Sequence, residues 1–326
     1  MDNGKASKPI PADGDETQVT NARRGAHIIF GSRSANTRRT YASAWKSFEM
    51  FCAEQECSAL PASPQTIAAY LTGLATAGRA FRTIDVHRSA IAVVHRQLQF
   101  GNPIEDPAVR EVIGGLSRTL GRRPRHQARP LEVREIVLML EVADRRLNTA
   151  GLRDAALCAL GFLGALRRSE LASLCVEDLT FENLGLWVCV RRSKMDPSGR
   201  RQMVPILNGR RLRVSGRIHA WLRHSALGPE APLFVPDNRG GALEPTRSLD
   251  GRDVNRSVQR YARSAGLDLE NVSAHSLRAG FVTCAVRAGA RLDKLRAITR
   301  HQDLAVLMNY ARDAEAFHDH PAASFA

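Results

Sequence analysis

Three short sequences near one end of the chain are the centre of its organisation: HSLR at residues 275–278, RH at 300–301 and NYAR at 309–312. A His and an Arg three residues apart, such as His275 and Arg278, lie on one face of a helix. His301 precedes Tyr310 by nine residues. That distance is about two and a half helical turns if Asp303 caps a helix that runs to about residue 316.

These side chains supply two imidazoles, a guanidinium and a phenol. An Arg binds a phosphate through two parallel hydrogen bonds, and a His takes up or gives away a proton near neutral pH. A Tyr can act as a covalent nucleophile. Together they can bind a phosphodiester and attack it. Each residue alone has an ordinary explanation, as a solvated helix position or as packing, so the prediction needs support from the rest of the chain.

The charge of the chain points to a polyanionic partner. Its 326 residues, enough for two domains with cores, include 47 basic and 33 acidic side chains, for a net charge of +14. Residues 1–130 hold 18 basic and 11 acidic groups and residues 131–326 hold 29 and 22, so each part has an excess of +7. Two basic lobes suit a grip on one polyanion. The alternative is a merely basic protein from an Arg-biased genome.

The first part of the chain is predicted to be helical. Residues 1–33 show little apolar periodicity and are expected to form a disordered N-terminal arm. Ser63-Pro64 and Asp106-Pro107 are helix start signals, because a capping side chain precedes Pro at the first helical position. The sequence predicts a small all-helical domain over residues 34–121, with helices at about 34–55, 64–76, 83–98 and 107–120.

A basic linker follows. Residues 121–130 read GRRPRHQARP, and two Pro with four Arg make a poor helix and a good extended segment. We assign residues 122–130 to this linker. Arg122, Arg123 and Arg125 can lie along a phosphate backbone. A plain solvated hinge of the same composition is an equal alternative.

The second domain is expected over residues 131–326, beginning with helices at about 132–146 and 152–163. The sequence GALRRSEL at residues 164–171 then places Arg167 and Glu170 three residues apart at a helix entry. A carboxylate there can orient the guanidinium for a phosphate. An ordinary ion pair within a helix has the same pattern.

Two strands with a turn between them are predicted next. Residues 186–194 and 200–207 are rich in strand formers, and MDPSG at 195–199 is turn chemistry. Lys194 lies at the tip end of this hairpin and is the one Lys between Lys46 and Lys294. An amine whose pKa falls can give up a proton, as a general acid must. A solvated hairpin Lys is the alternative.

Helices are expected again at about 209–226 and 250–265, and the stretch containing residues 275–312 completes the domain. The fold class is therefore mainly α with a small β-sheet: an N-terminal helical domain and an α+β second domain. The six Cys are scattered without Cys-x-x-Cys spacing, so neither a zinc site nor a redox motif is indicated. No apolar run is long enough to span a bilayer, and a reduced, cytoplasmic setting fits.

The ordered set of these motifs closely resembles the tyrosine recombinase (phage integrase) family, in its Cre-like branch. The family's first box, Gly-Leu-Arg-x-Ser-Glu-Leu, stands here as residues 165–171, and its hairpin box, Arg-x-Ser-Lys-x-Asp, stands as residues 191–196. The nine-residue spacing from the second His to the Tyr also matches the family. The resemblance covers roughly residues 34–316 and implies a SAM-like core-binding domain followed by a catalytic domain.

The resemblance implies that the chain cuts and rejoins DNA without metal, ATP or any other cofactor. Tyr310 would attack the scissile phosphate and leave a 3′-phosphotyrosine with a free 5′-hydroxyl, while Lys194 would protonate the leaving oxygen. Arg167 and Arg278 would hold the non-bridging oxygens. The remaining roles would fall to His275 (accepting the Tyr proton or positioning Tyr310), His301 (donating a hydrogen bond to the phosphate) and Glu170 (supporting the set from behind).

The partners implied are double-stranded DNA with inverted half-sites and three further copies of the chain, forming a homotetramer on DNA near the nucleoid. Affinity should be largely electrostatic, and helices of both domains are candidates for the grooves. The target site and any accessory protein are not specified. The candidate DNA-contacting residues are Arg82, Arg88, Arg122, Arg123, Arg125, Arg252, Arg256 and Arg260.

The sequence departs from the family pattern at three positions. Ala165 and Arg300 replace the usual Gly of two boxes, and Ala279 stands where many members have a second His. The first two substitutions can alter local backbone shape. Two rival functions share most of the pattern: a type IB topoisomerase-like enzyme that relaxes DNA as a monomer, and a DNA-binding regulator that does not cleave.

Overall fold

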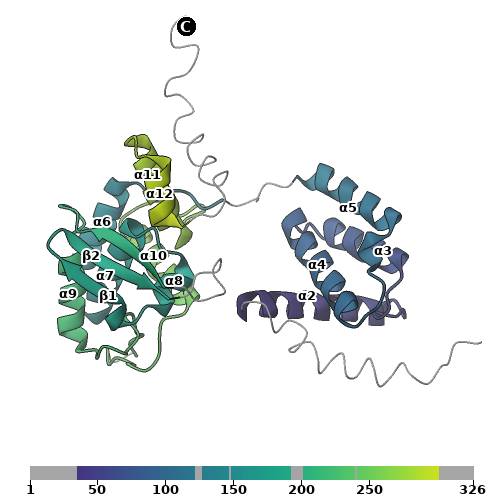
Figure 1. Cartoon of the computed structure of the whole chain (residues 1–326), viewed down its shortest axis with the longest axis horizontal. Helices are drawn as coiled ribbons and strands as arrows, with labels where there is room; N and C mark the ends of the chain where they lie inside the picture. The colour runs from purple at the N-terminus through teal and green to yellow at the C-terminus, as the bar shows by residue number, and fades with distance from the viewer. Residues whose placement is uncertain (1–34, 122–126, 147, 192–200, 239–240, 301–326) are drawn as a thin grey trace, which may run out of the picture. The chain divides into compact units, whose positions relative to one another are not determined.

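The computed structural model describes residues 35–121, 127–146, 148–191, 201–238 and 241–300. The chain divides into two compact units, Met1–Arg125 and His126–Ala326 (Figure 1). Several predicted features lie outside the described residues: the N-terminal arm, the helix from Asp303, Arg122, Arg123, Arg125, Lys194, His301 and Tyr310. The described fold is mainly helical with one small sheet, so the predicted fold class is confirmed.

The described part of the first unit is helical, as predicted. Ser63 caps its second helix by accepting a hydrogen bond from the Thr66 backbone N–H at 3.1 Å. Asp106 caps the last helix in the same way, through the N–H of Ala108 at 2.9 Å. The elements are α2 (Ala35–Glu54), α3 (Pro64–Thr76), α4 (Phe81–Gln97), the 3-10 turn η1 (Pro103–Glu105) and α5 (Pro107–Leu120).

Among the described residues of this unit, one imidazole lies in the core with the apolar side chains. His95 is fully buried, and its Nε2 accepts a hydrogen bond from the backbone N–H of Ala62 at 3.0 Å. The proton therefore sits on Nδ1, which donates to the Ile91 carbonyl at 2.9 Å. Burial lowers the pKa of His95, so the ring is a neutral packing group. The core contains Trp45, Phe48, Ile67, Tyr70, Leu71, Ile84, Ile91 and Val109.

The second unit is built around α7, in which almost every residue from Gly151 to Phe162 is buried. Helices α6, α9 and α11 pack against it. Figure 1 shows α11 and α12 side by side at one end of this unit. Its helices are α6 (Val133–Arg145), α7 (Thr149–Leu163), α8 (Arg168–Ser173), α9 (Val214–Ser225), α10 (Gly251–Ser264), α11 (His275–Arg287) and α12 (Leu292–Thr299), with the 3-10 turn η2 (Val176–Asp178).

The sheet has three antiparallel strands in the order β1-β2-β3. The predicted hairpin strands are present as β2 (Gly185–Val190) and β3 (Gln202–Leu207), paired with Val188 opposite Val204. Strand β1 (Leu179–Glu182) pairs with β2 and was not predicted. It has four residues, two of them exposed, so it carries too short a pattern to identify.

Two helices differ from the prediction. Helix α9 begins at Val214 rather than near residue 209, because Gly209 and Arg213 both adopt a left-handed backbone that a helix cannot continue. Helix α12 was not predicted. It has eight residues, of which Leu295 and Thr299 are buried, which is a weak periodic signal. Its position matters, since it ends two residues before His301, the second predicted His.

Candidate functional site

The Arg167–Glu170 pair is formed at the start of α8. Arg167 is the N-cap residue of this helix, and Glu170 lies in its first turn. Oε1 of Glu170 accepts from Nη1 of Arg167 at 2.7 Å, and Oε2 accepts from the Arg167 backbone N–H at 2.8 Å. Nη2 of Arg167 donates to the backbone carbonyl of Arg300 at 3.3 Å. One carboxylate thus fixes both the backbone and the guanidinium of Arg167.

Glu170 is buried, with 1% of its side chain exposed. Burial alone raises the pKa of this carboxyl. The charges of Arg300 and Arg167 and the hydrogen bonds from Arg167 outweigh burial and bring the pKa of Glu170 below its ordinary value. The group is therefore an anion at neutral pH.

Arg278 comes from the first turn of α11 and is 1% exposed. Its Nη1 donates to the carbonyl of Ala165 at 2.6 Å, and its Nη2 donates to the carbonyl of Thr299. This one side chain thereby joins the segment before α8 to the end of α12. Arg278 is bound to the carbonyl of residue 299 and Arg167 to that of residue 300, so both guanidiniums meet the same short segment.

His275 is the first residue of α11 and is exposed. Although the residue as a whole is exposed, partial removal of solvent from the imidazole, followed by the positive charges of Arg278 and Arg167, lowers its pKa. The ring is therefore mostly neutral at pH 7 and able to accept a proton. His275 lies three residues before Arg278 in the first turn of α11, so the two side chains share one face of this helix.

The two positions that depart from the family's Gly both have a left-handed backbone: φ is +44° at Ala165 and +56° at Arg300. Glycine adopts this conformation at little cost, and other residues rarely do. The substitutions therefore keep a glycine-like backbone. Arg300 is the site residue that the sequence prediction missed, because its side chain donates to Oε2 of Glu170 at 2.6 Å.

Lys194, His301 and Tyr310 lie outside the described residues. Strand β2 ends at Val190, four residues before Lys194, and α12 ends at Thr299, two residues before His301. Arg167, Glu170, His275 and Arg278 are the predicted residues that the structure brings together. Arg167 lies directly before α8, Glu170 lies in α8, and His275 and Arg278 lie in α11.

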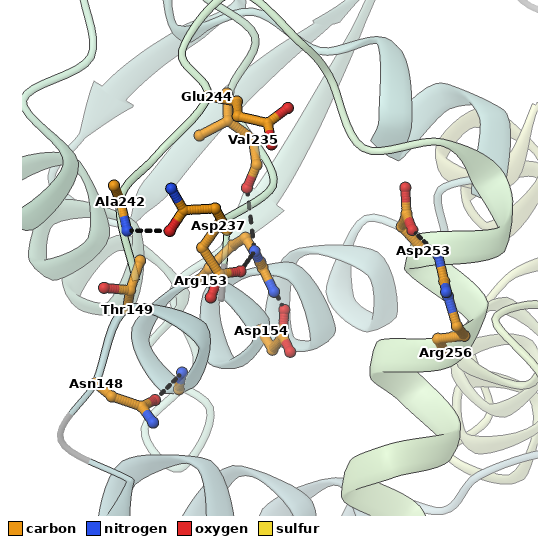
Figure 2. Close-up of polar contacts among 12 residues, drawn as sticks. Asn148, Thr149, Arg153, Asp154, Val235, Asp237, Ala242, Glu244, Asp253 and Arg256 are labelled. Carbon is orange, nitrogen blue, oxygen red and sulfur yellow. Dashed lines mark hydrogen bonds and ion pairs between the residues drawn. The ribbon is translucent and has the colours of Figure 1, made fainter. Parts of the chain in front are cut away.

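The predicted DNA-contacting residues within the described ranges lie on α4 and α10. Arg82 and Arg252 are exposed. Arg88 pairs with Asp85 at 2.8 Å, and Arg256 donates to Asp253 (Figure 2). Arg88 also lines a hollow of about 500 Å³ in the first unit, together with Arg96 and Arg110, which were not in the predicted set.

A second buried arginine, Arg153 on α7, fixes the loop that leads to α10 (Figure 2). Its Nε donates to Asp154 at 2.9 Å, and its Nη1 donates to Asp237 at 2.6 Å and to the carbonyl of Val235 at 3.1 Å. Arg260 of α10 lies 3.6 Å from the other oxygen of Asp154. Helix α10 is thereby tied to the centre of the unit.

Among the described residues, no group of three or more His, Cys, Asp or Glu side chains is placed to hold a metal ion. Within the same ranges, no helix combines the length and the apolar character needed to cross a membrane.

Known proteins match both parts of the chain. Residues 129–316 match the phage integrase family, and residues 28–99 match the phage integrase N-terminal SAM-like domain. An integrase/recombinase xerD homolog of Selenomonas ruminantium is 31% identical over 293 residues, which are 88% of this chain and 84% of that protein. The recombinase cre of Escherichia phage P1 is 22% identical over 326 residues, 94% of this chain and 92% of that protein.

Two solved structures share the fold. The XerH site-specific recombinase bound to its palindromic difH substrate has a TM-score of 0.69 at 18% identity, covering 92% of this chain and 82% of that one. A lambda integrase tetramer bound to a Holliday junction has a TM-score of 0.63 at 15% identity, covering 91% of this chain and 78% of that one. The family matches and the Selenomonas ruminantium relative confirm the resemblance that the sequence motifs predicted.

Proposed function

Because the chain belongs to the phage integrase family of tyrosine recombinases, we propose that it recombines DNA at specific sites by cleaving and rejoining strands through a 3′-phosphotyrosine. One observation carries this proposal. Arg167 and Arg278, which are distant in sequence, both donate to backbone carbonyls where α12 ends, His275 lies one helical turn before Arg278, and His301 comes two residues after that end. Two guanidiniums beside a neutral imidazole suit a phosphodiester that gains negative charge during attack.

In the proposed cleavage step, Oη of Tyr310 attacks the phosphorus, and the bond from phosphorus to the 5′-oxygen breaks. The Tyr proton passes to His275, or His275 positions Tyr310 for the attack. Lys194 gives its proton to the leaving 5′-oxygen. His301 donates a hydrogen bond to the phosphate. The covalent link conserves the energy of the phosphodiester, so rejoining by the reverse step needs no ATP or metal.

Arg167 and Arg278 would hold the non-bridging oxygens. Arg167 uses two of its five N–H groups to bind Glu170 and the Arg300 carbonyl through its side chain, which leaves donors for a phosphate. Glu170 is buried and binds Arg167 directly, and it thereby supports the two arginines. Its negative charge keeps Arg167 in one orientation, which reduces the reorganisation needed when DNA binds.

The division of labour is part of the proposal. Residues 34–121 would form a DNA-binding domain, residues 122–130 a linker along the backbone, and residues 131–326 the catalytic domain. Exchange of strands between two duplexes needs two breaks in each, hence a homotetramer on inverted half-sites. An enzyme with this substrate would work in the cytoplasm, at the nucleoid.

The test is covalent trapping on nicked duplexes drawn from a library of the DNA that flanks the protein's own gene. The nick lets the short 5′-hydroxyl fragment diffuse away, so a cleaved complex cannot rejoin. We expect a slowly migrating band on a denaturing gel that is absent in Tyr310→Phe. Tyr261→Phe is the matched control, because Tyr261 is a buried Tyr whose hydroxyl has no hydrogen-bond partner among the described residues.

Two other outcomes would overturn the proposal. Salt-sensitive binding to this DNA without a covalent band would indicate a DNA-binding protein that does not cleave. Relaxation of supercoiled DNA by a monomer, without preference for a site, would indicate a type IB topoisomerase-like enzyme.

A further inference from the structure

Arg300 makes an unusual set of contacts behind the proposed site. Its guanidinium donates Nη2 to Oε2 of Glu170 at 2.6 Å and Nη1 to the carbonyl of Ile298 at 2.8 Å. Its own backbone carbonyl accepts from Nη2 of Arg167 at 3.3 Å. One residue therefore contacts Arg167 through its backbone and the partner of Arg167 through its side chain.

These contacts are made at the expense of stability. The backbone of Arg300 is left-handed, with φ of +56°, and only 6% of its side chain is exposed. Its Nε is buried without a hydrogen-bond partner among the described residues. A buried ion pair contributes little net stability, and an unpartnered buried N–H and a left-handed backbone both oppose folding. Stability alone is therefore a poor explanation for an Arg at this position.

The charge balance suggests a better explanation. Glu170 carries one negative charge and is bound by two guanidiniums, those of Arg167 and Arg300. If Arg300 were neutral, the Arg167–Glu170 pair would have no net charge. With Arg300 present, the three groups have a net charge of +1, in a region where burial weakens screening.

We propose that Arg300 is a positioning residue for strand cleavage, which binds one oxygen of Glu170 and thereby keeps Arg167 oriented and its positive charge available to the scissile phosphate. This inference rests on the proposed function and deepens it. Arg300 touches Glu170 rather than the phosphate. Its contribution should therefore appear in the rate of cleavage more than in the affinity for DNA.

The experiment compares Arg300→Gly, Arg300→Asn and Arg300→Lys with the unaltered chain. Gly and Asn both tolerate the left-handed backbone, so they remove the guanidinium without adding strain. Arg213→Gly is the matched control, because Arg213 is an exposed Arg with φ of +47° at the start of α9. It removes the same charge and the same kind of backbone constraint away from the site.

Single-turnover cleavage and DNA dissociation constants are measured for each protein on one nicked duplex. We expect Arg300→Gly and Arg300→Asn to cleave about 10- to 100-fold more slowly, with dissociation constants within about threefold of the unaltered chain. Arg300→Lys keeps the charge and should recover part of the loss. Arg213→Gly should cleave at the normal rate.

The outcomes separate the two proposals. If the unaltered chain forms no covalent complex, the proposed function fails. If it does, and Arg300→Gly cleaves equally fast, the positioning role of Arg300 is overturned. A slow Arg300→Gly whose rate is restored when measured per folded molecule would also overturn that role, because only stability would then have changed.

Discussion

Two buried clusters in the second unit are built from the same groups in different proportions. In the Arg153 cluster, two carboxylates, those of Asp154 and Asp237, bind the Arg153 guanidinium, and Arg260 lies 3.6 Å from Asp154. In the Glu170 cluster, one carboxylate is shared by two guanidiniums, those of Arg167 and Arg300. The first has no surplus positive charge, whereas the second has a surplus of one. The difference separates a cluster that ties the fold together from one suited to an anionic substrate.

The electrostatic consequences follow this difference. Burial alone would lower the pKa of Arg153, but Asp154 and Asp237 raise it above its ordinary value. At Arg300, burial and the charge of Arg167 lower the pKa, and Glu170 compensates only in part. The Arg153 guanidinium is well satisfied by the protein itself. The Glu170 cluster has a surplus positive charge, so an additional anion, such as a phosphate, would stabilise it.

The largest effect is expected from Arg153→Ala. It removes the guanidinium that binds the fully buried Asp154 at 2.9 Å, leaving the more distant Arg260 at 3.6 Å, and releases the loop that carries Val235. The free energy of unfolding should fall by about 3–5 kcal/mol, measured by urea denaturation. The cleavage rate per folded molecule should stay unchanged. Arg145→Ala, at a position 78% exposed on α6, is the control and should change stability little. A specific loss of cleavage in folded Arg153→Ala would undermine the contrast between the clusters.

Next in size is Arg278→Lys. The variant keeps a positive charge but cannot bind the Ala165 and Thr299 carbonyls and a phosphate in one planar arrangement. Single-turnover cleavage should fall by about 10²–10³-fold, as for loss of one donor to a developing anion. DNA affinity, measured by fluorescence anisotropy, should change far less. Equal losses in affinity and in rate would mean that Arg278 only binds DNA.

The smallest effect concerns pH. The pKa of Glu170 is lowered in the folded state from its ordinary 4.5, so the ionised group stabilises the fold above pH 4.5. This stabilisation is lost as pH falls through the lower folded value. The difference in unfolding free energy between the unaltered chain and Glu170→Gln should therefore shrink on acidification from pH 7 to about 3. A constant difference in urea denaturation across that range would contradict this account of the Glu170 cluster.

Local sequence signals predicted the parts of the fold that depend on neighbouring residues. Ser63 caps its helix, the hairpin strands pair as expected, and Arg167 binds Glu170 three residues on. The role of Arg300 could not be predicted, because it depends on a left-handed backbone and on a partner 130 residues away. Strand β1 escaped prediction because its pairing with β2, rather than its own sequence, defines it. The roles of Lys194, His301 and Tyr310 remain predictions from the sequence motifs.

In the proposed function, the cluster around Arg167 and Arg278 serves a covalent attack by Tyr310. The most direct measurement is mass spectrometry of the protease-digested covalent complex after nuclease trimming of the DNA. We expect a nucleotide joined through its 3′-phosphate to the peptide that contains Tyr310. A nucleotide attached to another residue, or joined through a 5′-phosphate, would contradict it.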